Sequence, residues 1–130
     1  MLRDIPSHKI SLHTNLDASS WHMIEDAEFN LMKPTAYLVN TARGPLINQV
    51  ALTKALQSNQ ISGAALDVLE EEPPAEDDPI FTLPNIICFP HIGTATEETR
   101  RAMRELAVQN LIAVITGEKP PAPVNPEVLG

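Results

Sequence analysis

Residues 36–44 read Ala-Tyr-Leu-Val-Asn-Thr-Ala-Arg-Gly, and this stretch decides the fold. Its first four residues are continuously apolar, which is typical of a strand that is covered on both faces in a parallel sheet. Similar short runs recur along the chain, and segments with helical spacing separate them. The sequence therefore predicts four strands, at 9–13, 36–40, 63–68 and 86–89.

Three helices are expected between and after these strands, at 24–32, 48–58 and 94–117. Asn48 is a suitable N-cap for the second helix, and Asn59 is a plausible left-handed stop after it. Thr94 and Glu97 have the spacing of a capping box at the start of the third helix, and Gly117 stands at its end. Strands that alternate with helices indicate an α/β fold with a parallel sheet.

The charge and composition exclude several classes of protein. The 130 residues include 9 Lys and Arg against 17 Asp and Glu, a formal net charge of −8, so we expect no nucleic-acid partner. No apolar run approaches the roughly 18 residues that a membrane span requires, so we expect no membrane partner. The single cysteine, Cys88, cannot form an internal disulfide, which indicates a reducing, cytoplasmic location.

Charged side chains follow the expected strands at the points where the strands end. Arg43 follows the second strand, Asp67 and the acidic residues 70–72 follow the third, and His91 follows the fourth. In a parallel sheet these points meet at the edge where ligands bind. An arginine there can hold a carboxylate, and a histidine beside a carboxylate can move a proton near neutral pH. Singly, each residue is more often a surface group; together they favour a site for a 2-oxo or 2-hydroxy acid.

Other kinds of site are not indicated by the sequence. The histidines and Cys88 lack metal-ligand spacing, so we expect no metal site. The chain has no Gly-x-Ser-x-Gly nucleophile motif, and its five glycines do not form the Gly-x-Gly-x-x-Gly turn that binds a pyrophosphate. We expect His8, His22, Glu70 and Glu71 to be exposed and His13 to have a structural role. Cys88 is expected to be a small core residue.

Six blocks of sequence together resemble one family. They are Ser-Leu-His at 11–13, Leu-Met-Lys-Pro at 31–34, Val-Asn-Thr-Ala-Arg-Gly at 39–44, Gly-Ala-Ala-Leu-Asp-Val at 63–68, Glu-Glu-Glu-Pro at 70–73 and Pro-His-Ile-Gly at 90–93. In this order they resemble the D-isomer-specific 2-hydroxyacid dehydrogenases, and the closing Pro-Val-Asn at 123–125 is most similar to the glyoxylate and hydroxypyruvate reductase branch. The resemblance implies a partial Rossmann-like parallel sheet, the second half of a doubly wound dinucleotide-binding domain, with a long carboxyl-terminal helix. It implies that 1–95 belong to the NAD(P)-binding domain and that 96–130 form a helix and tail that return to the substrate domain.

The resemblance also implies roles for single residues. Arg43 matches the arginine that binds the substrate carboxylate. Glu72 matches the glutamate that pairs with the catalytic histidine, so the His91 ring is expected within about 4 Å of the Glu72 carboxylate. His91 matches the general acid that protonates the carbonyl oxygen while NADH or NADPH supplies the hydride. Contacts with the cofactor, NAD or NADP, are expected from residues that follow the strands, namely Thr14, Asn15, Thr41, Ala42, Asp67 and Gly93.

Three positions depart from the family pattern, which usually has Pro where Asn15 stands, a small residue where Thr94 stands and often Thr where Phe89 stands. These departures are expected to reshape the ribose and nicotinamide pocket. The family's substrate-domain segment and first βαβ unit, with its glycine-rich turn, are expected to precede residue 1. We therefore expect the chain to be the carboxyl-terminal part of a dehydrogenase, and to be inactive by itself.

A second hypothesis is that the chain is a non-catalytic α/β module that only self-associates or assembles with a missing amino-terminal half. In the doubly wound order of the family, the strand at 9–13 pairs with the first strand of the missing βαβ unit, so the resemblance implies that it is an unprotected edge here. The last helix is expected to lack cover for its apolar stripe, which consists of Met103, Leu106, Leu111 and Val114. Both features predict a homo-oligomer, because four apolar side chains left in water forfeit several kcal/mol, at roughly 1.5 to 3 kcal/mol each.

Overall fold

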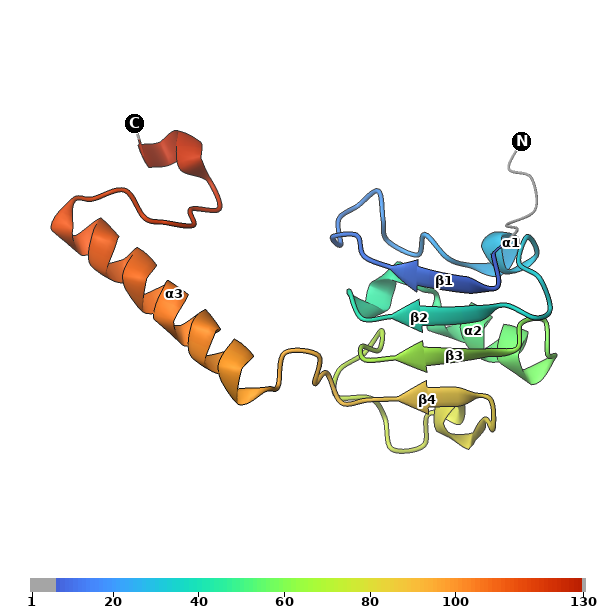
Figure 1. The fold of residues 1–130 in the computed structure, drawn as a ribbon. Helices are drawn as coiled ribbons and strands as arrows, with labels where there is room; N and C mark the ends of the chain where they lie inside the picture. The colour runs from blue at the N-terminus through green and yellow to red at the C-terminus, as the bar shows by residue number, and fades with distance from the viewer. Residues whose placement is uncertain (1–6, 130) are drawn as a thin grey trace. The chain divides into compact units, whose positions relative to one another are not determined.

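A parallel sheet forms the centre of the fold in the computed structural model, which describes residues 7–129. Its strands lie side by side in chain order, as β1 (Lys9–Leu12), β2 (Tyr37–Asn40), β3 (Gly63–Leu66) and β4 (Ile86–Cys88) (Figure 1). All three neighbouring pairs are parallel. The predicted α/β fold is confirmed, and the carboxyl ends of the four strands lie at one edge of the sheet.

Two helices cover one face of this sheet. They are α1 (Asp26–Phe29) and α2 (Gln49–Gln57), and Figure 1 shows both behind the strands. Alternate strand residues such as Leu38 and Leu66 point into a single core, in which they are joined by Phe29 and Leu52 from the helices. A helix face with Leu52, Ala55 and Leu56, each 1% exposed, explains how α2 is held on the sheet.

The opposite face of the sheet is open within this unit, which corrects the expectation that 36–40 is covered on both faces. Tyr37 and Ile87 are 52% and 59% exposed, and Val39 and Ala65 are half-buried. Register places Val39 beside Ala65 and Ala65 beside Ile87, so these side chains share one face. The physical reason is that both helices lie on the other side of the strands.

The first helix is shorter than the predicted span of 24–32. Glu25 caps α1 in a reciprocal capping box with Glu28, so the helix cannot begin earlier. Ile24 instead bridges to Ile47, and its backbone N–H donates to the Leu46 carbonyl at 3.1 Å. Ile24 has helical spacing in the sequence, but it forms a strand-like contact with a distant loop instead.

The second helix agrees with its prediction. Asn48 is the N-cap, and its side chain accepts a hydrogen bond from the Ala51 backbone at 3.1 Å. Asn59 follows the helix with φ of 54°, the left-handed conformation expected of a stop residue. Two short 3-10 helices complete the unit, η1 (Gly44–Leu46) after β2 and η2 (Pro79–Thr82) before β4.

The chain divides into two compact units between Ile92 and Gly93. The second unit contains α3 (Glu97–Thr116), followed by η3 (Pro126–Leu129). Its N-cap is Thr96 rather than the predicted Thr94, since the Thr96 hydroxyl accepts from the Thr99 N–H at 3.2 Å.

Gly117 ends α3 with φ of 76°, as predicted. The expected apolar stripe of this helix is exposed, with Met103, Leu111 and Val114 between 55% and 59% exposed. Ala113 is the one buried residue recorded within α3.

Candidate active site

The carboxyl edge of the sheet brings together loops from all four strands. Thr14 and Asn15 follow β1, the loop 40–43 follows β2, the loop 67–72 follows β3 and His91 follows β4. Because each loop begins at the end of a strand, its first residues are fixed by the ladder beneath it. The edge predicted from the sequence is thus formed.

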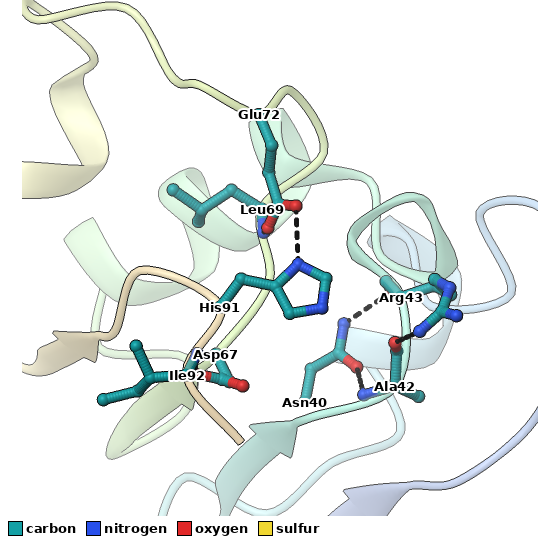
Figure 2. A network of polar contacts seen from close by, with 8 residues as sticks. All are labelled: Asn40, Ala42, Arg43, Asp67, Leu69, Glu72, His91 and Ile92. Atoms are coloured by element: carbon teal, nitrogen blue, oxygen red, sulfur yellow. Dashed lines mark hydrogen bonds and ion pairs between the residues drawn. The ribbon is translucent and has the colours of Figure 1, made fainter. Parts of the chain in front are cut away.

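The predicted histidine–carboxylate pair is present. The Nδ1 atom of His91 lies 2.9 Å from Oε2 of Glu72, well inside the predicted limit of about 4 Å (Figure 2). The second carboxylate oxygen of Glu72 accepts a hydrogen bond from the Leu69 N–H at 3.1 Å. Both oxygens are therefore used, one to hold the loop and one to hold the ring.

The backbone of His91 helps to aim the ring. Its φ is 55°, in the left-handed region that histidine enters more readily than most residues. The side chains of His91 and Glu72 are 52% and 38% exposed. Figure 2 shows Nε2 of the ring pointing away from Glu72. Within the described residues Nε2 forms no hydrogen bond, so this nitrogen can transfer a proton while Glu72 holds Nδ1.

The loop that carries Arg43 is organised by Asn40, which sequence reasoning missed. Asn40 is fully buried; its amide donates to the Arg43 carbonyl at 2.8 Å and its oxygen accepts from the Ala42 N–H at 3.0 Å (Figure 2). The Arg43 guanidinium is exposed and donates from Nη1 to the Ala42 carbonyl at 2.7 Å. It has no carboxylate partner among the described residues, so it is available to bind an anion. The signal for Asn40 was a polar residue that ends an apolar strand.

Gly44 allows the loops after β2 and β3 to touch. A Cβ at this position would lie 1.7 Å from the Leu69 carbonyl oxygen, so only glycine fits. The glycine of the Arg-Gly pair is thus explained by close backbone approach. The contact links the loop of Arg43 to the loop of Glu72.

Asp67 lies at the end of β3 and holds the turn of the histidine. Its side chain is buried, and Oδ1 accepts a hydrogen bond from the Ile92 N–H at 2.8 Å (Figure 2). Gly93, the next residue, begins the second unit. Thr41 is exposed and Ala42 is half-buried on the neighbouring loop. The structure therefore gives Asp67 a place beside the His91 turn, in addition to the cofactor contact expected from the resemblance.

The turn after β1 is ordered by Asp17. The Asp17 carboxylate accepts hydrogen bonds from the hydroxyl and N–H of Ser19, at 2.6 and 2.8 Å, and from the Asn15 amide at 2.9 Å. The Ser19 hydroxyl is the main cause that lowers the pKa of Asp17. Thr14 contacts Asn15 at 3.5 Å. This network fixes the two residues of the turn that were predicted to touch the cofactor.

The donor set at the edge fits the nicotinamide end of NAD or NADP. It offers threonine hydroxyls at 14 and 41, backbone groups of the 40–43 loop and the buried carboxylate of Asp67. The five glycines of the chain, at 44, 63, 93, 117 and 130, form no glycine-rich turn for the pyrophosphate. Hydroxyl, backbone and carboxylate groups are thus present at this edge, whereas a glycine-rich turn is not part of this sequence.

A second histidine–carboxylate pair uses the same loop as the first. Nε2 of His22 is 2.7 Å from Oε1 of Glu70. The expectation that both residues are exposed is wrong, because their side chains are only 24% and 28% exposed. Glu71 is exposed as expected. The pair was missed because its members are 48 residues apart and belong to no local motif.

The remaining histidines lie at the surface. His8 contacts the Thr35 hydroxyl at 2.8 Å, and His13 contacts the Ser11 hydroxyl at 2.8 Å; both are exposed. Cys88 is half-buried at the margin of the core. Over residues 7–129, the His, Cys, Asp and Glu side chains form no group of three or more that could hold a metal ion. In the same range, no helix has the length and apolar character to cross a membrane.

Known proteins share both the sequence and the fold of this chain. The sequence profile of "D-isomer specific 2-hydroxyacid dehydrogenase, NAD binding domain" matches residues 6–93. The glyoxylate reductase of Thermofilum pendens is 50% identical over 120 residues, which are 92% of this chain and 35% of the relative.

Two solved structures extend the comparison. A D-isomer specific 2-hydroxyacid dehydrogenase from Lactobacillus delbrueckii, in its NAD-complexed form, is 33% identical with a TM-score of 0.82, covering 91% of this chain and 40% of that one. The NADPH-dependent glyoxylate/hydroxypyruvate reductase of Sinorhizobium meliloti, in complex with NADP and malonate, is 31% identical with a TM-score of 0.86, covering 92% and 37%.

The fold and site define a Rossmann-like domain of the dinucleotide-binding class, with four parallel strands and polar groups at their carboxyl ends. The profile match makes the assignment narrower: the chain belongs to the D-isomer specific 2-hydroxyacid dehydrogenase family, in its NAD-binding domain. It spans about a third of the length of the curated relatives that it matches.

Proposed function

We propose that the protein to which this chain belongs reduces a small 2-oxo acid, of the glyoxylate or hydroxypyruvate class, to the 2-hydroxy acid with NADH or NADPH. The observation that carries the proposal is the His91–Glu72 pair, 2.9 Å apart, at the same sheet edge as the exposed Arg43. An acid beside an anion-binding arginine is what the reduction of a 2-oxo acid requires. The names of the relatives support the substrate class.

Each residue of the edge has a distinct role in this proposal. Arg43 binds the substrate carboxylate with two parallel hydrogen bonds and orients the carbonyl beside it. Nε2–H of His91 donates a proton to the carbonyl oxygen, and the ring regains a proton from water afterwards. Glu72 keeps Nδ1 occupied and stabilises the charged ring before the transfer. In the oxidative direction, Nε2 of His91 removes the proton from the hydroxyl group.

NAD or NADP supplies the hydride when it is bound. Thr14, Asn15, Thr41, Ala42, Asp67 and Gly93 are the residues of this chain that we propose to hold the cofactor. Their position after successive strands matches where dinucleotides bind in such sheets. Binding of the pyrophosphate at a glycine-rich turn belongs to a part of the protein outside this sequence.

We also propose that the chain assembles with copies of itself, in the cytoplasm. The support is the exposed edge of β1 (Lys9–Leu12) and the exposed apolar residues of α3 (Glu97–Thr116). Unpaired strand edges and apolar stripes both favour association. Sedimentation at micromolar concentration is expected to detect a dimer or larger species, and a sharp 14.2 kDa monomer at all concentrations would contradict this. Cell fractionation tests the location.

The second candidate function is a non-catalytic module that acts only by assembly. The observation in its favour is that the sequence has no pyrophosphate-binding turn. Under this alternative the chain does not support turnover even when an amino-terminal partner is supplied.

A chimaera separates the two functions. In it, this chain replaces the matching 120 residues of the Thermofilum pendens glyoxylate reductase, which supplies the rest of the protein. We expect it to oxidise NADH or NADPH when glyoxylate or hydroxypyruvate is added, and we expect the isolated chain to have no measurable activity. A folded chimaera that binds the nucleotide but turns over neither substrate would contradict the proposed function.

A further inference from the structure

The His22–Glu70 pair is part of a larger hydrogen-bonded cluster, to which Gln49 is central. Oε2 of Glu70 accepts from the Gln49 N–H at 2.9 Å, while the Gln49 side-chain oxygen accepts from the Glu70 N–H at 3.0 Å. The Gln49 amide donates to Asp78 at 2.7 Å. Each carboxylate oxygen of Glu70 thus has one partner, and Gln49 and Glu70 hold each other reciprocally.

The cluster joins three segments that are far apart in the sequence. The His22 N–H donates to the Pro45 carbonyl at 2.8 Å, just after Arg43 and Gly44, while its ring reaches Glu70. The Asn48 N–H donates to the Ile24 carbonyl at 2.9 Å in the same region. The segments 22–24, 45–49 and 67–72 are therefore held together by both backbone and side-chain bonds.

Leu69 connects this cluster to the Glu72 carboxylate. Leu69, next to Glu70, donates its N–H to Glu72 at 3.1 Å, and its carbonyl packs against Gly44. Leu69 thus contacts both catalytic loops, through its N–H on one side and its carbonyl on the other. If Glu70 moves, the Leu69 N–H that orients Glu72 moves with it.

We propose that His22, Gln49 and Glu70 are positioning residues, which hold the loop of Glu72 against the loop of Arg43 and so keep Glu72 aimed at Nδ1 of His91. The inference deepens the proposed function and rests on it for its kinetic consequence. Its structural consequence, the geometry of the His91 ring, does not depend on activity.

The expected size of the effect follows from how proton transfer depends on geometry. A displacement of about 1 Å at a catalytic group can cost up to 100-fold in rate. His22 has φ of 50° and its ring stacks on Trp21 with centroids 4.9 Å apart, so a replacement must still reach Glu70 from a constrained backbone. Glutamine can place a donor near the position of Nε2, whereas alanine cannot.

The kinetic test uses the chimaera. We expect His22→Ala and Glu70→Gln to lower kcat roughly 10- to 100-fold while the KM for the nucleotide changes little, because the hydrogen bonds of the cluster lead through Leu69 to Glu72 and do not end on a proposed cofactor residue. His22→Gln is expected to recover most of the lost kcat. Glu71→Gln is the matched control, since it removes the same charge from an adjacent exposed residue, and it should leave kcat unchanged.

The structural test uses the 130-residue chain itself. The ring-nitrogen chemical shifts of His91 report which nitrogen carries the proton, and the Glu72 bond favours the proton on Nδ1. We expect Glu70→Gln and Gln49→Ala to shift His91 toward a mixture of tautomers, and Glu71→Gln to leave it unchanged. If one of these variants does not fold, the other still gives the measurement.

The outcomes distinguish the inference from the proposed function. An inactive chimaera with altered His91 tautomers in the variants contradicts the proposed function and supports the positioning role. An active chimaera in which every folded variant keeps the parental kcat and the parental His91 tautomer overturns the positioning role. A loss of kcat that His22→Gln does not recover, without any change at His91, also overturns it.

Discussion

The molecule contains the same chemical pair twice, and the two copies differ in what surrounds them. His22 pairs with Glu70 at 2.7 Å and His91 pairs with Glu72 at 2.9 Å, and the two carboxylates belong to one loop. Both histidines have left-handed backbones, with φ of 50° and 55°. Residue type, backbone conformation and pair distance are thus nearly equal, and none of them explains why one pair is suited to catalysis.

The difference lies in the exposure and the surroundings of the two rings. The His22 side chain is 24% exposed and stacks on Trp21, and its glutamate is also bonded to Gln49. The His91 side chain is 52% exposed. In each ring the nitrogen that does not face the glutamate, Nδ1 of His22 and Nε2 of His91, has no hydrogen bond among residues 7–129. A proton is exchanged with a substrate more readily at the more exposed ring. The comparison teaches that exposure of the ring, rather than the carboxylate partner or a free ring nitrogen, distinguishes the proposed acid from the positioning histidine.

The largest expected effect comes from two single variants of the chimaera, in which one or the other histidine is replaced by glutamine. His91→Gln is expected to lower kcat by about 10²- to 10⁴-fold, because glutamine cannot act as a general acid. His22→Gln should have a far smaller effect, since only a hydrogen-bond donor is needed there. Steady-state kinetics measures both. Equal losses in the two variants would show that the distinction between the pairs is wrong.

The second prediction concerns the anion-binding residue that completes the catalytic side of the comparison. Arg43→Lys is expected to lower kcat/KM for the 2-oxo acid roughly 10- to 100-fold, because one ammonium cannot form two parallel hydrogen bonds and a charged hydrogen bond contributes about 1.5 to 3 kcal/mol. The loop itself should survive, since Asn40 bonds to the backbone of residue 43. Unchanged kinetics with glyoxylate would remove Arg43 from the mechanism.

How far the sequence predicts this site depends on the range of the interactions. The strands, α2 and the Asn59 stop are specified by local patterns. The parallel strands predicted that His91 and the acidic residues 70–72 meet at one edge, and the resemblance to the family singled out Glu72 as the partner of His91. The cluster of His22, Gln49 and Glu70 was not predicted, because its bonds join residues that are 48 and 21 positions apart and belong to no sequence motif. Long-range polar contacts of this kind depend on the packed loops and leave no periodic signal.

The early end of α1 has a related cause. Ile24 has helical spacing, but its bridge to Ile47 depends on where the loop after β2 (Tyr37–Asn40) lies. Which faces of the sheet are covered by helices also depends on the tertiary structure. A continuous apolar run in β2 does not state whether helices lie on one face or on both.

The third prediction tests the contact that joins the two loops. Gly44→Ala is expected to destabilise the chain by about 1 to 3 kcal/mol or more, because the new Cβ would overlap the Leu69 backbone. Gly117→Ala is the matched control; its Cβ meets nothing within 4 Å, and only the left-handed φ of 76° opposes it, which costs about 1 to 2 kcal/mol. Urea unfolding of the chain measures both. In the Gly44 variant, the ring signals of both histidines should shift together. Signals that stay unchanged in a folded variant would contradict the contact.

The smallest expected effect concerns Cys88, on the strand that leads to His91. Burial is the main cause that raises the pKa of the Cys88 thiol, and the negative charge of Asp78 raises it further. A raised pKa leaves less thiolate at a given pH, so alkylation by iodoacetamide near about pH 8 should be slower than for an unfolded cysteine and should accelerate as the pH rises.

The two causes can be separated, and the reaction also probes the two pairs. Urea removes both causes and should give the fastest alkylation, whereas Asp78→Asn removes only the charge and should give a modest increase over the parent. Cys88 lines a pocket of about 350 Å³ together with Glu72 and His91, but not His22 or Glu70. The alkyl group should therefore shift the ring signals of His91 and leave those of His22 in place. Alkylation in the native chain as fast as in urea would refute the protection of Cys88, and equal shifts at both rings would refute the separation of the pairs.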